Sequence, residues 1–363
     1  MQLPAIWRER LARIIRLRRH LNALFRYATP FRLYNLILIE SERILGREVL
    51  RGLPYVFVVD PLNTCQLRCP LCITGTGDLP LPSGKMRLAQ YRQFIDGIAR
   101  HTIKLDLYNW GEPFLHRDIV EMISYAHLRR ISTAISSNLN ALPPGGGEAV
   151  VRSGLDDLIV SCDGLTQETY SRYRKRGDLG KLLVNLKEIA EAKHRLRSRT
   201  PHIEFQFLVF RHNEHEVPQV NRFAREHGAD QVRLMAPFLD LSADEILPST
   251  LPEFIKPIYT GVNALDPEIS MFVPNPRQEE SVHLHPPPIS CYWPWRSLAV
   301  NWNGELDPCC FGNFLDSFGN IFDTPLAEIW NGHVYRSARR WIRGKPLEGD
   351  ALRIVCRGCP GYH

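Results

Sequence analysis

The sequence of 363 residues lacks a long apolar run, since no stretch approaches the roughly 20 apolar residues that a membrane-spanning helix needs. Its N-terminus lacks the apolar core and the small-residue cleavage site of a secretory signal peptide. We therefore expect a cytoplasmic protein. The sequence shows no internal repeat, no RNA-binding domain and no basic patch interleaved with aromatic residues, which argues against nucleic acid as a partner.

Basic and acidic residues balance over most of the chain, but its start carries a strong net positive charge. The formal net charge is +6, and seven arginines with a single glutamate in the first 26 residues account for all of it. We expect residues 1–52 to form a helical extension that is basic and amphipathic. Such a helix is typical of a segment that lies on a membrane surface or docks an acidic partner, although its apolar stripe could instead pack on the protein. The residues of the expected stripe are Trp7, Leu11, Ile14, Leu21, Leu24 and Phe25.

The nine cysteines are few and clustered, which indicates metal ligation in a reducing compartment rather than disulfides. Cys65, Cys69 and Cys72 follow an apolar, β-branched run at residues 55–60 that reads as a buried strand. Three thiolates can hold a [4Fe–4S] cluster and leave one iron open to a ligand. The pair Cys69 and Cys72 alone would also suit half of a zinc site.

Strand-like and helix-like stretches alternate from about residue 55 to residue 245. This rhythm predicts a parallel sheet with crossover helices. Dense prolines between residues 237 and 294 indicate a linker, and a second cysteine-rich module begins at Cys291. The predicted strands are 55–60, 103–108, 131–136, 157–161, 203–210 and 231–235, and the predicted helices are 87–99, 117–128, 180–196 and 216–227.

Polar motifs follow three of the predicted strands. Gly111 and Glu112 come after the second strand, where glycine permits close approach of a ligand and a carboxylate can accept hydrogen bonds from an amine. Residues 136–138, Ser-Ser-Asn, come after the third strand. Residues 161–164, Ser-Cys-Asp-Gly, come after the fourth, and the downstream Arg174 has the fork geometry that suits a carboxylate.

The C-terminal module contains four cysteines that can complete a second metal site. Their spacing suits either a [4Fe–4S] cluster or structural zinc. The remaining cysteine, Cys310, directly follows one of them. The four predicted ligands are Cys291, Cys309, Cys356 and Cys359.

From residue 55 to the end, these motifs resemble the radical S-adenosylmethionine (SAM) superfamily, and the C-terminal module resembles its SPASM or twitch domains. The resemblance implies an α/β fold with a partial (β/α)6 barrel similar to a TIM barrel at residues 53–245. The extension at 1–52 would precede this barrel. A proline-rich linker at 246–290 and a small auxiliary cluster domain at 291–363 would follow it.

The resemblance also implies the cofactors, namely SAM and two [4Fe–4S] clusters. The cluster at Cys65, Cys69 and Cys72 would bind SAM through its open iron, and the four C-terminal cysteines would hold the auxiliary cluster. The expected SAM contacts run from the ammonium and carboxylate groups to the ribose and adenine. The residues expected to make them are Gly111, Glu112, Ser136, Asn138, Ser161, Arg174 and Val209.

The function that follows is radical chemistry. The cofactor provides the radical, and the protein directs it to one position of the substrate. We predict an oxidoreductase- or epimerase-type enzyme that accepts an electron from a flavodoxin or ferredoxin and cleaves SAM to a 5′-deoxyadenosyl radical. This radical would abstract hydrogen from a small molecule such as a sugar or cyclitol, for dehydrogenation or epimerisation. In epimerisation Cys310 would donate a hydrogen atom, although it could also be a packing residue. The alternatives are maturation of a peptide and a non-catalytic iron–sulfur electron-transfer protein.

Overall fold

The structure is a computed structural model that describes residues 21–237, 246–254, 291–310, 317–345 and 356. The chain divides into two compact units. The first contains Thr64–Leu79 and Ile103–Lys256 together with the chain up to Ala28. The second contains Thr29–Asn63, Pro80–Thr102 and Pro257–His363. The arginine-rich part of the predicted extension, apart from Arg26, lies outside the described residues.

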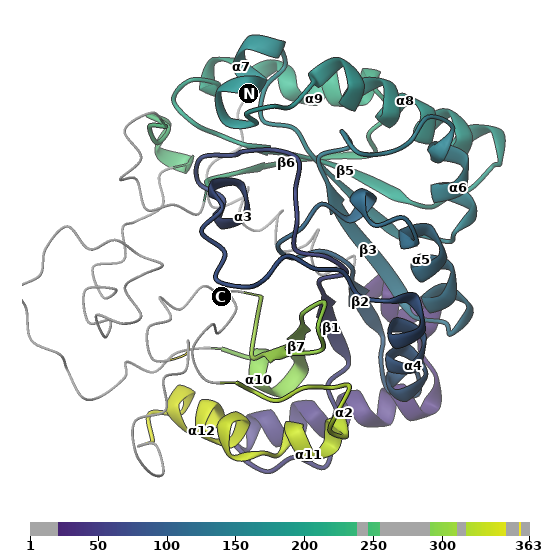
Figure 1. The fold of residues 1–363 in the computed structure, drawn as a ribbon, viewed down its shortest axis with the longest axis vertical. Helices are drawn as coiled ribbons and strands as arrows, with labels where there is room; N and C mark the ends of the chain where they lie inside the picture. The colour runs from purple at the N-terminus through teal and green to yellow at the C-terminus, as the bar shows by residue number, and fades with distance from the viewer. Residues whose placement is uncertain (1–20, 238–245, 255–290, 311–316, 346–355, 357–363) are drawn as a thin grey trace, which may run out of the picture. The chain divides into compact units, whose positions relative to one another are not determined.

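The first unit contains five parallel strands in the order β6-β5-β4-β3-β2 (Figure 1). The register between β4 and β5 runs from Asp157 opposite His202 to Ser161 opposite Gln206. The strands are β2 (Lys104–Asp106), β3 (Ser132–Ser137), β4 (Asp157–Ser161), β5 (His202–Leu208) and β6 (Gln231–Met235).

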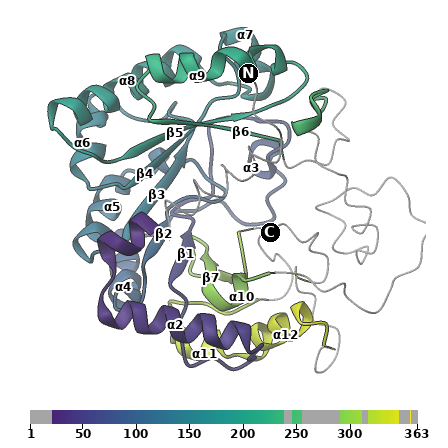
Figure 2. The same ribbon diagram turned by 180° about the vertical axis from the view of Figure 1, so that it is seen from behind.

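The central strand β4 is buried along its whole length, as expected for a parallel strand covered on both faces. Figures 1 and 2 show α5, α6, α8 and α9 on one side of these strands, as crossover helices require. The Asp178 side chain caps α8 by accepting a hydrogen bond from the Lys181 amide. The helices are α3 (Ile73–Thr76), α5 (Ile119–Leu128), α6 (Gly146–Arg152), α7 (Gln167–Tyr173), α8 (Leu179–Arg195) and α9 (Val217–Glu226).

The second unit contains β1 (Val56–Val59), which pairs in parallel with β7 (Ser297–Val300), and β8 (Leu306–Asp307), which pairs antiparallel with β7. Its core includes Trp295 and Trp330, both fully buried. Arg339 is also buried and donates hydrogen bonds to three backbone carbonyls. Its helices are α2 (Pro30–Ile44), α4 (Leu88–Ile98), α10 (Trp293–Arg296), α11 (Leu326–Trp330) and α12 (His333–Ile342).

The α/β class with parallel strands and crossover helices is confirmed. All six predicted strands are present, as β1 to β6, and the four predicted helices are α4, α5, α8 and α9. The short helices α6 and α7 were not predicted. The linker at 246–290 is described only for residues 246–254, so it and the other domain boundaries stay predictions. No helix in the described ranges is long and apolar enough to cross a membrane.

His101 is a buried titratable group in the second unit. Its ring centroid lies 6.2 Å from that of Phe57. No described residue makes a hydrogen bond to its Nε2. Burial, together with the nearby Arg32 guanidinium, lowers the pKa of His101 to about 4, because both disfavour the imidazolium. The unfolded chain therefore binds a proton below pH 6.5 that the folded protein binds only near pH 4.

We expect the free energy of unfolding to fall as the pH is lowered from about 6.5 to about 4, with His101 contributing about 2 kcal/mol of the loss by about pH 5. Urea unfolding followed by circular dichroism would measure this. His101→Gln should weaken the pH dependence, because it removes the group that the folded protein keeps neutral. An identical pH profile for His101→Gln and the wild type would contradict the assignment.

Candidate functional site

The three cysteines of the first motif lie in the first unit, on the loop that leads into α3. Cys69 is buried, Cys65 and Cys72 are half-buried, and none forms a disulfide. All three pack on one apolar cluster that includes Tyr173 and Phe210. Burial raises the pKa of the Cys65 thiol to about 12, with smaller contributions from Glu112 and the two other thiols. The three sulfurs are therefore close enough to interact, and iron binding there must displace protons.

Gly75 in α3 permits the tight winding of this loop. A Cβ atom at Gly75 would lie 2.5 Å from the carbonyl oxygen of Cys69 and 2.7 Å from its amide nitrogen. Because both neighbours are backbone atoms, they cannot move aside as a flexible side chain could. The approach of α3 to Cys69 therefore depends on the missing side chain.

Glu112 joins the end of β2 to the end of β3. Its side chain is buried and accepts hydrogen bonds from the Ser137 hydroxyl at 2.6 Å, the Asn138 amide at 2.8 Å and the Phe114 amide at 3.2 Å. Its own amide donates to the Thr64 carbonyl at 2.9 Å, next to the cysteine loop. Burial raises the pKa of Glu112, and the three hydrogen bonds act in the opposite direction.

Asn138 lies between Glu112 and the cysteines. Its Nδ2 donates to the sulfur of Cys65 at 3.7 Å, and its Oδ1 accepts from Gln66 at 2.8 Å. The hydroxyl oxygens of Ser136 and Ser161 lie 3.5 Å apart, at the ends of β3 and β4. The strand-end residues predicted from the sequence are thus neighbours at the carboxyl ends of adjacent parallel strands.

Arg174 has a partner that the sequence analysis did not assign to it. Its Nε donates to Oδ2 of Asp163 at 2.6 Å, and the Arg174 side chain is 14% exposed while that of Asp163 is fully buried. The Nη1 atom of Arg174 lies 3.9 Å from the sulfur of Cys69. Burial raises the pKa of Asp163, and the Arg174 guanidinium opposes that shift. The Ser-Cys-Asp-Gly motif was the signal that could have revealed this pair.

Two further residues of this region are fully buried. The Val209 side chain is inaccessible, and its amide donates to the Met235 carbonyl at 2.9 Å, so only its carbonyl remains for a ligand. Cys162 donates to the Gly164 carbonyl at 3.3 Å, and burial raises its pKa. Cys162 is therefore a structural thiol, because a reactive cysteine needs exposure and a lowered pKa.

The C-terminal cysteines lie in the second unit. Cys291, Cys309 and Cys310 are half-buried and Cys356 is buried. Burial raises the pKa of Tyr335, and Cys309 and Cys356 both contribute, which brings these two thiols to the same side chain. Cys359, the fourth predicted ligand, lies outside the described residues.

No group of three or more His, Cys, Asp or Glu side chains in the described part of the chain converges on a point where it could hold a single metal ion. A [4Fe–4S] cluster binds each thiolate through a different iron, so it does not need this convergence. The three free thiols of the first unit, two of them approached by hydrogen-bond donors, fit such a cluster.

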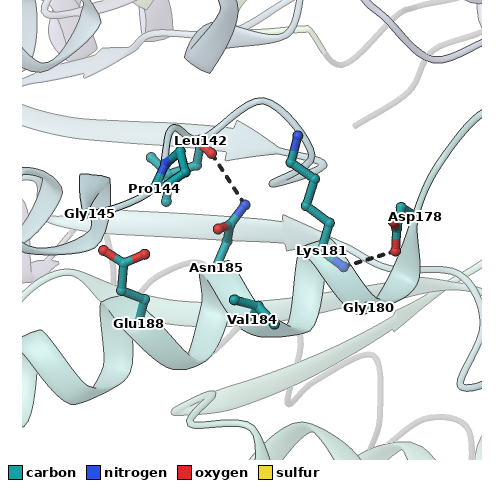
Figure 3. A pocket seen from close by; sticks show the side chains of 9 residues that line it. All are labelled: Leu142, Pro144, Gly145, Asp178, Gly180, Lys181, Val184, Asn185 and Glu188. Carbon is teal, nitrogen blue, oxygen red and sulfur yellow. Dashed lines mark hydrogen bonds between the residues drawn. The ribbon is translucent and has the colours of Figure 1, made fainter.

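A separate hollow of about 500 Å³ opens between α8 and the loop before α6 (Figure 3). Its polar side chains have structural roles: Asn185 donates to the Leu139 and Leu142 carbonyls, and Asp178 caps α8. It contains none of the predicted site residues. The residues that line it are Leu142, Pro144, Gly145, Asp178, Gly180, Lys181, Val184, Asn185 and Glu188.

Residues 291–360 match the SPASM iron–sulfur cluster-binding domain. The chain is 24% identical over 322 residues to a PqqA peptide cyclase of Xanthomonas campestris, which covers 85% of this chain and 79% of that protein. The structure of Streptococcus suis SuiB bound to S-adenosylmethionine has the same fold, with a TM-score of 0.59, 13% identity, and coverage of 82% of this chain and 70% of that one. These findings confirm the predicted resemblance to radical SAM enzymes that carry a C-terminal SPASM domain. The predicted cofactors, SAM and two [4Fe–4S] clusters, agree with the match to a cluster-binding domain and with the SAM-bound structures of similar fold.

The predicted substrate class is wrong. We predicted hydrogen abstraction from a small molecule such as a sugar or cyclitol, for dehydrogenation or epimerisation. The relatives contradict this, because several PqqA peptide cyclases align with most of the chain. An AdoMet-dependent heme synthase of Methanosarcina barkeri is also similar, at 22% identity over 81% of this chain and 88% of that protein. Peptide maturation, the alternative, fits these relatives better.

We expect Asp163→Asn to lower the free energy of unfolding by about 3 kcal/mol, because it leaves the Arg174 guanidinium largely buried without a counter-charge. Chemical denaturation would measure the loss. The matched control is Glu168→Gln on α7, which breaks an exposed ion pair with Arg172 and should cost less than about 1 kcal/mol. Equal stabilities for the two variants would contradict the role of the buried pair.

Gly75→Ala should prevent α3 from packing on Cys69 and so reduce iron after anaerobic reconstitution, from about eight towards about four atoms per chain. Iron and sulfide analysis would measure this. Gly97→Ala in α4 is the control, since a Cβ at Gly97 meets no atom within 4 Å. Full iron content in Gly75→Ala would show that the loop tolerates a side chain there.

Proposed function

We propose that this radical SAM enzyme matures a peptide, by hydrogen abstraction followed by formation of a covalent bond within the peptide. The observation that carries the proposal is the alignment with PqqA peptide cyclases over 85% of the chain. SuiB bound to its precursor peptide SuiA offers a further parallel in fold, with a TM-score of 0.55 at 14% identity.

For the SAM site, we propose that Cys65, Cys69 and Cys72 hold the first cluster. The cluster held by these cysteines would supply one-electron reducing chemistry to SAM bound beside it. The loop's contribution is to exclude water, because the thiols pack on the apolar side chains of Tyr173 and Phe210. It also positions a donor from Asn138 on Cys65.

The polar residues at the strand ends would bind the amino-acid part of SAM. Glu112 accepts three hydrogen bonds on its two oxygens, which leaves capacity for one more donor such as an ammonium group. Arg174 uses Nε on Asp163 and Nη1 near Cys69, so Nη2 remains for a carboxylate. We assign the backbone at Gly111, with Ser136, Asn138, Ser161 and Val209, to the rest of the cofactor.

In the second unit, Cys291, Cys309, Cys356 and Cys359 would hold the auxiliary cluster. When bound, the auxiliary cluster would supply a one-electron acceptor for the oxidation. The half-buried Cys310 stays a candidate hydrogen-atom donor for reactions that quench a substrate radical. A flavodoxin or ferredoxin would supply the initial electron, which is consistent with a cytoplasmic location.

The test uses reconstituted, reduced protein with SAM and synthetic peptides encoded next to its gene. We expect 5′-deoxyadenosine and a peptide two hydrogens lighter, detected by mass spectrometry, because closing a bond between two carbon or heteroatom centres removes one hydrogen from each. Cys69→Ala should abolish both products, since the first cluster loses a ligand.

Three outcomes would count against the proposal in different ways. SAM cleavage without a mass change in any peptide, but with consumption of a porphyrin precursor, would move the substrate to the class named by the heme synthase relative. Undiminished cleavage in Cys69→Ala would overturn the cysteine assignment. Absence of any cleavage by the fully loaded wild-type protein would favour an electron-transfer role.

A further inference from the structure

Helix α2 is amphipathic in the reverse sense to an ordinary surface helix. Three of the four residues on its buried face are polar: Arg32, Asn35 and Glu42, beside Ile39. Asn35 pairs with both backbone groups of Leu53, at 2.7 and 2.9 Å. A surface helix usually buries its apolar stripe and exposes its polar one.

The buried polar groups are fully engaged with backbone of the same unit. An Arg32 terminal nitrogen donates to the Ala99 carbonyl at 2.6 Å. The Glu42 carboxylate accepts from the amides of Arg51 and Gly52 at 2.9 and 3.1 Å. Hydrogen bonds from these polar side chains therefore help to hold the helix in place, together with the buried Ile39.

The opposite face of α2 is apolar and exposed. Tyr34, Ile37, Ile44 and Leu45 are each between 63% and 70% exposed, and Leu33 is 40% exposed. At 100° per residue these five positions fall on one arc of the helix and its C-terminal cap. Ser41, in the same arc, donates its hydroxyl to the Ile37 carbonyl at 2.8 Å. The arc thus presents no charged group, and its serine hydroxyl is bonded within the helix.

Helix α2 packs against α10 of its own unit, and Figures 1 and 2 show it in the same region as α11 and α12. Contiguous apolar surface of this kind marks an interaction site, because monomeric proteins rarely leave it in water. We call this surface the α2 face, defined by Leu33, Tyr34, Ile37, Ile44 and Leu45.

The charges next to the α2 face are basic. The acidic groups there are neutralised within the unit, since Glu40 pairs with Arg43 and Arg296, and Glu48 pairs with Arg340 and Lys345. The exposed side chain of Arg47, two residues after Leu45, has no charged or hydrogen-bonding partner among the described residues.

The chain that leads into α2 adds seven arginines against one glutamate in its first 26 residues. An anionic surface would therefore be attracted, whereas a second copy of the same basic segment would be repelled.

We propose that the α2 face is a docking surface for an anionic phospholipid membrane. The helix lies in the plane of the interface, its apolar arc enters the boundary between headgroups and acyl chains, and the neighbouring arginines contact phosphates. The tyrosine at position 34 suits this depth, because its ring is apolar and its hydroxyl is polar. The α2 face contains none of the residues proposed to bind SAM, and its role does not depend on the peptide being the substrate.

The experiment is flotation of the full-length, cluster-loaded protein with vesicles of phosphatidylglycerol and phosphatidylcholine, compared with vesicles of phosphatidylcholine alone. We expect binding to the anionic vesicles that weakens with added salt. Ile37→Glu combined with Ile44→Glu should lower the partition coefficient at least about tenfold, because it places charge in the apolar arc.

The matched control is Val184→Glu on α8, which adds a glutamate at an equally exposed apolar position, 66% exposed, and should bind as the wild type does. Both variants should keep the wild-type circular dichroism and iron content, since the changed side chains lie in solvent.

Equal binding of the double variant and the wild type would overturn the proposal, as would failure of the wild type to bind anionic vesicles. A wild-type dimer in lipid-free sedimentation that the double variant loses, without vesicle binding by either protein, would assign the face to a second copy and also overturn it.

Discussion

The arrangement of the first unit depends on the buried carboxylate of Asp163. One of its oxygens binds the Arg174 guanidinium, the other accepts from the Leu208 amide at 2.7 Å, and its backbone carbonyl accepts from Asn213 at 2.9 Å. These bonds tie the end of β4 to the end of α7 and to the end of β5. Because an unpaired buried charge is costly, we expect the ends of β4, α7 and β5 to reach their folded positions together.

Glu112 performs the equivalent role for the neighbouring strands. It connects the turn after β2, the end of β3 and the start of the cysteine loop through four hydrogen bonds. The two buried carboxylates flank Cys65 and Cys69, so the loop has few ways to move independently of the strand ends. A ligand at this edge therefore meets groups that are already oriented, which reduces the ordering cost of binding.

The strands were predictable because their apolar, β-branched runs have few other stable arrangements, and the strand-end motifs followed from parallel topology. The carboxyl ends of neighbouring parallel strands meet at one edge, so Glu112, Asn138 and Ser161 had to become neighbours. The partner of Arg174 was not predictable, because Asp163 lies eleven residues before it in the sequence. Asp163 can compete with an external ligand for Arg174 only when α7 folds back onto the end of β4. The outward apolar face of α2 was missed for a similar reason: its polar residues find backbone partners that are distant in sequence. The predicted substrate class was wrong because the chain contains no sequence motif that identifies a substrate.

The approach of Asn138 to Cys65 and of Arg174 to Cys69 has an electronic consequence. Hydrogen bonds and positive charge next to a cluster sulfur draw electron density from it and stabilise the reduced state, which raises the reduction potential. Both donors belong to residues that are also assigned to SAM. Binding of SAM would draw the donors of Asn138 and Arg174 from the sulfurs towards the ligand. Binding of SAM and uptake of an electron would therefore be thermodynamically linked through these two side chains.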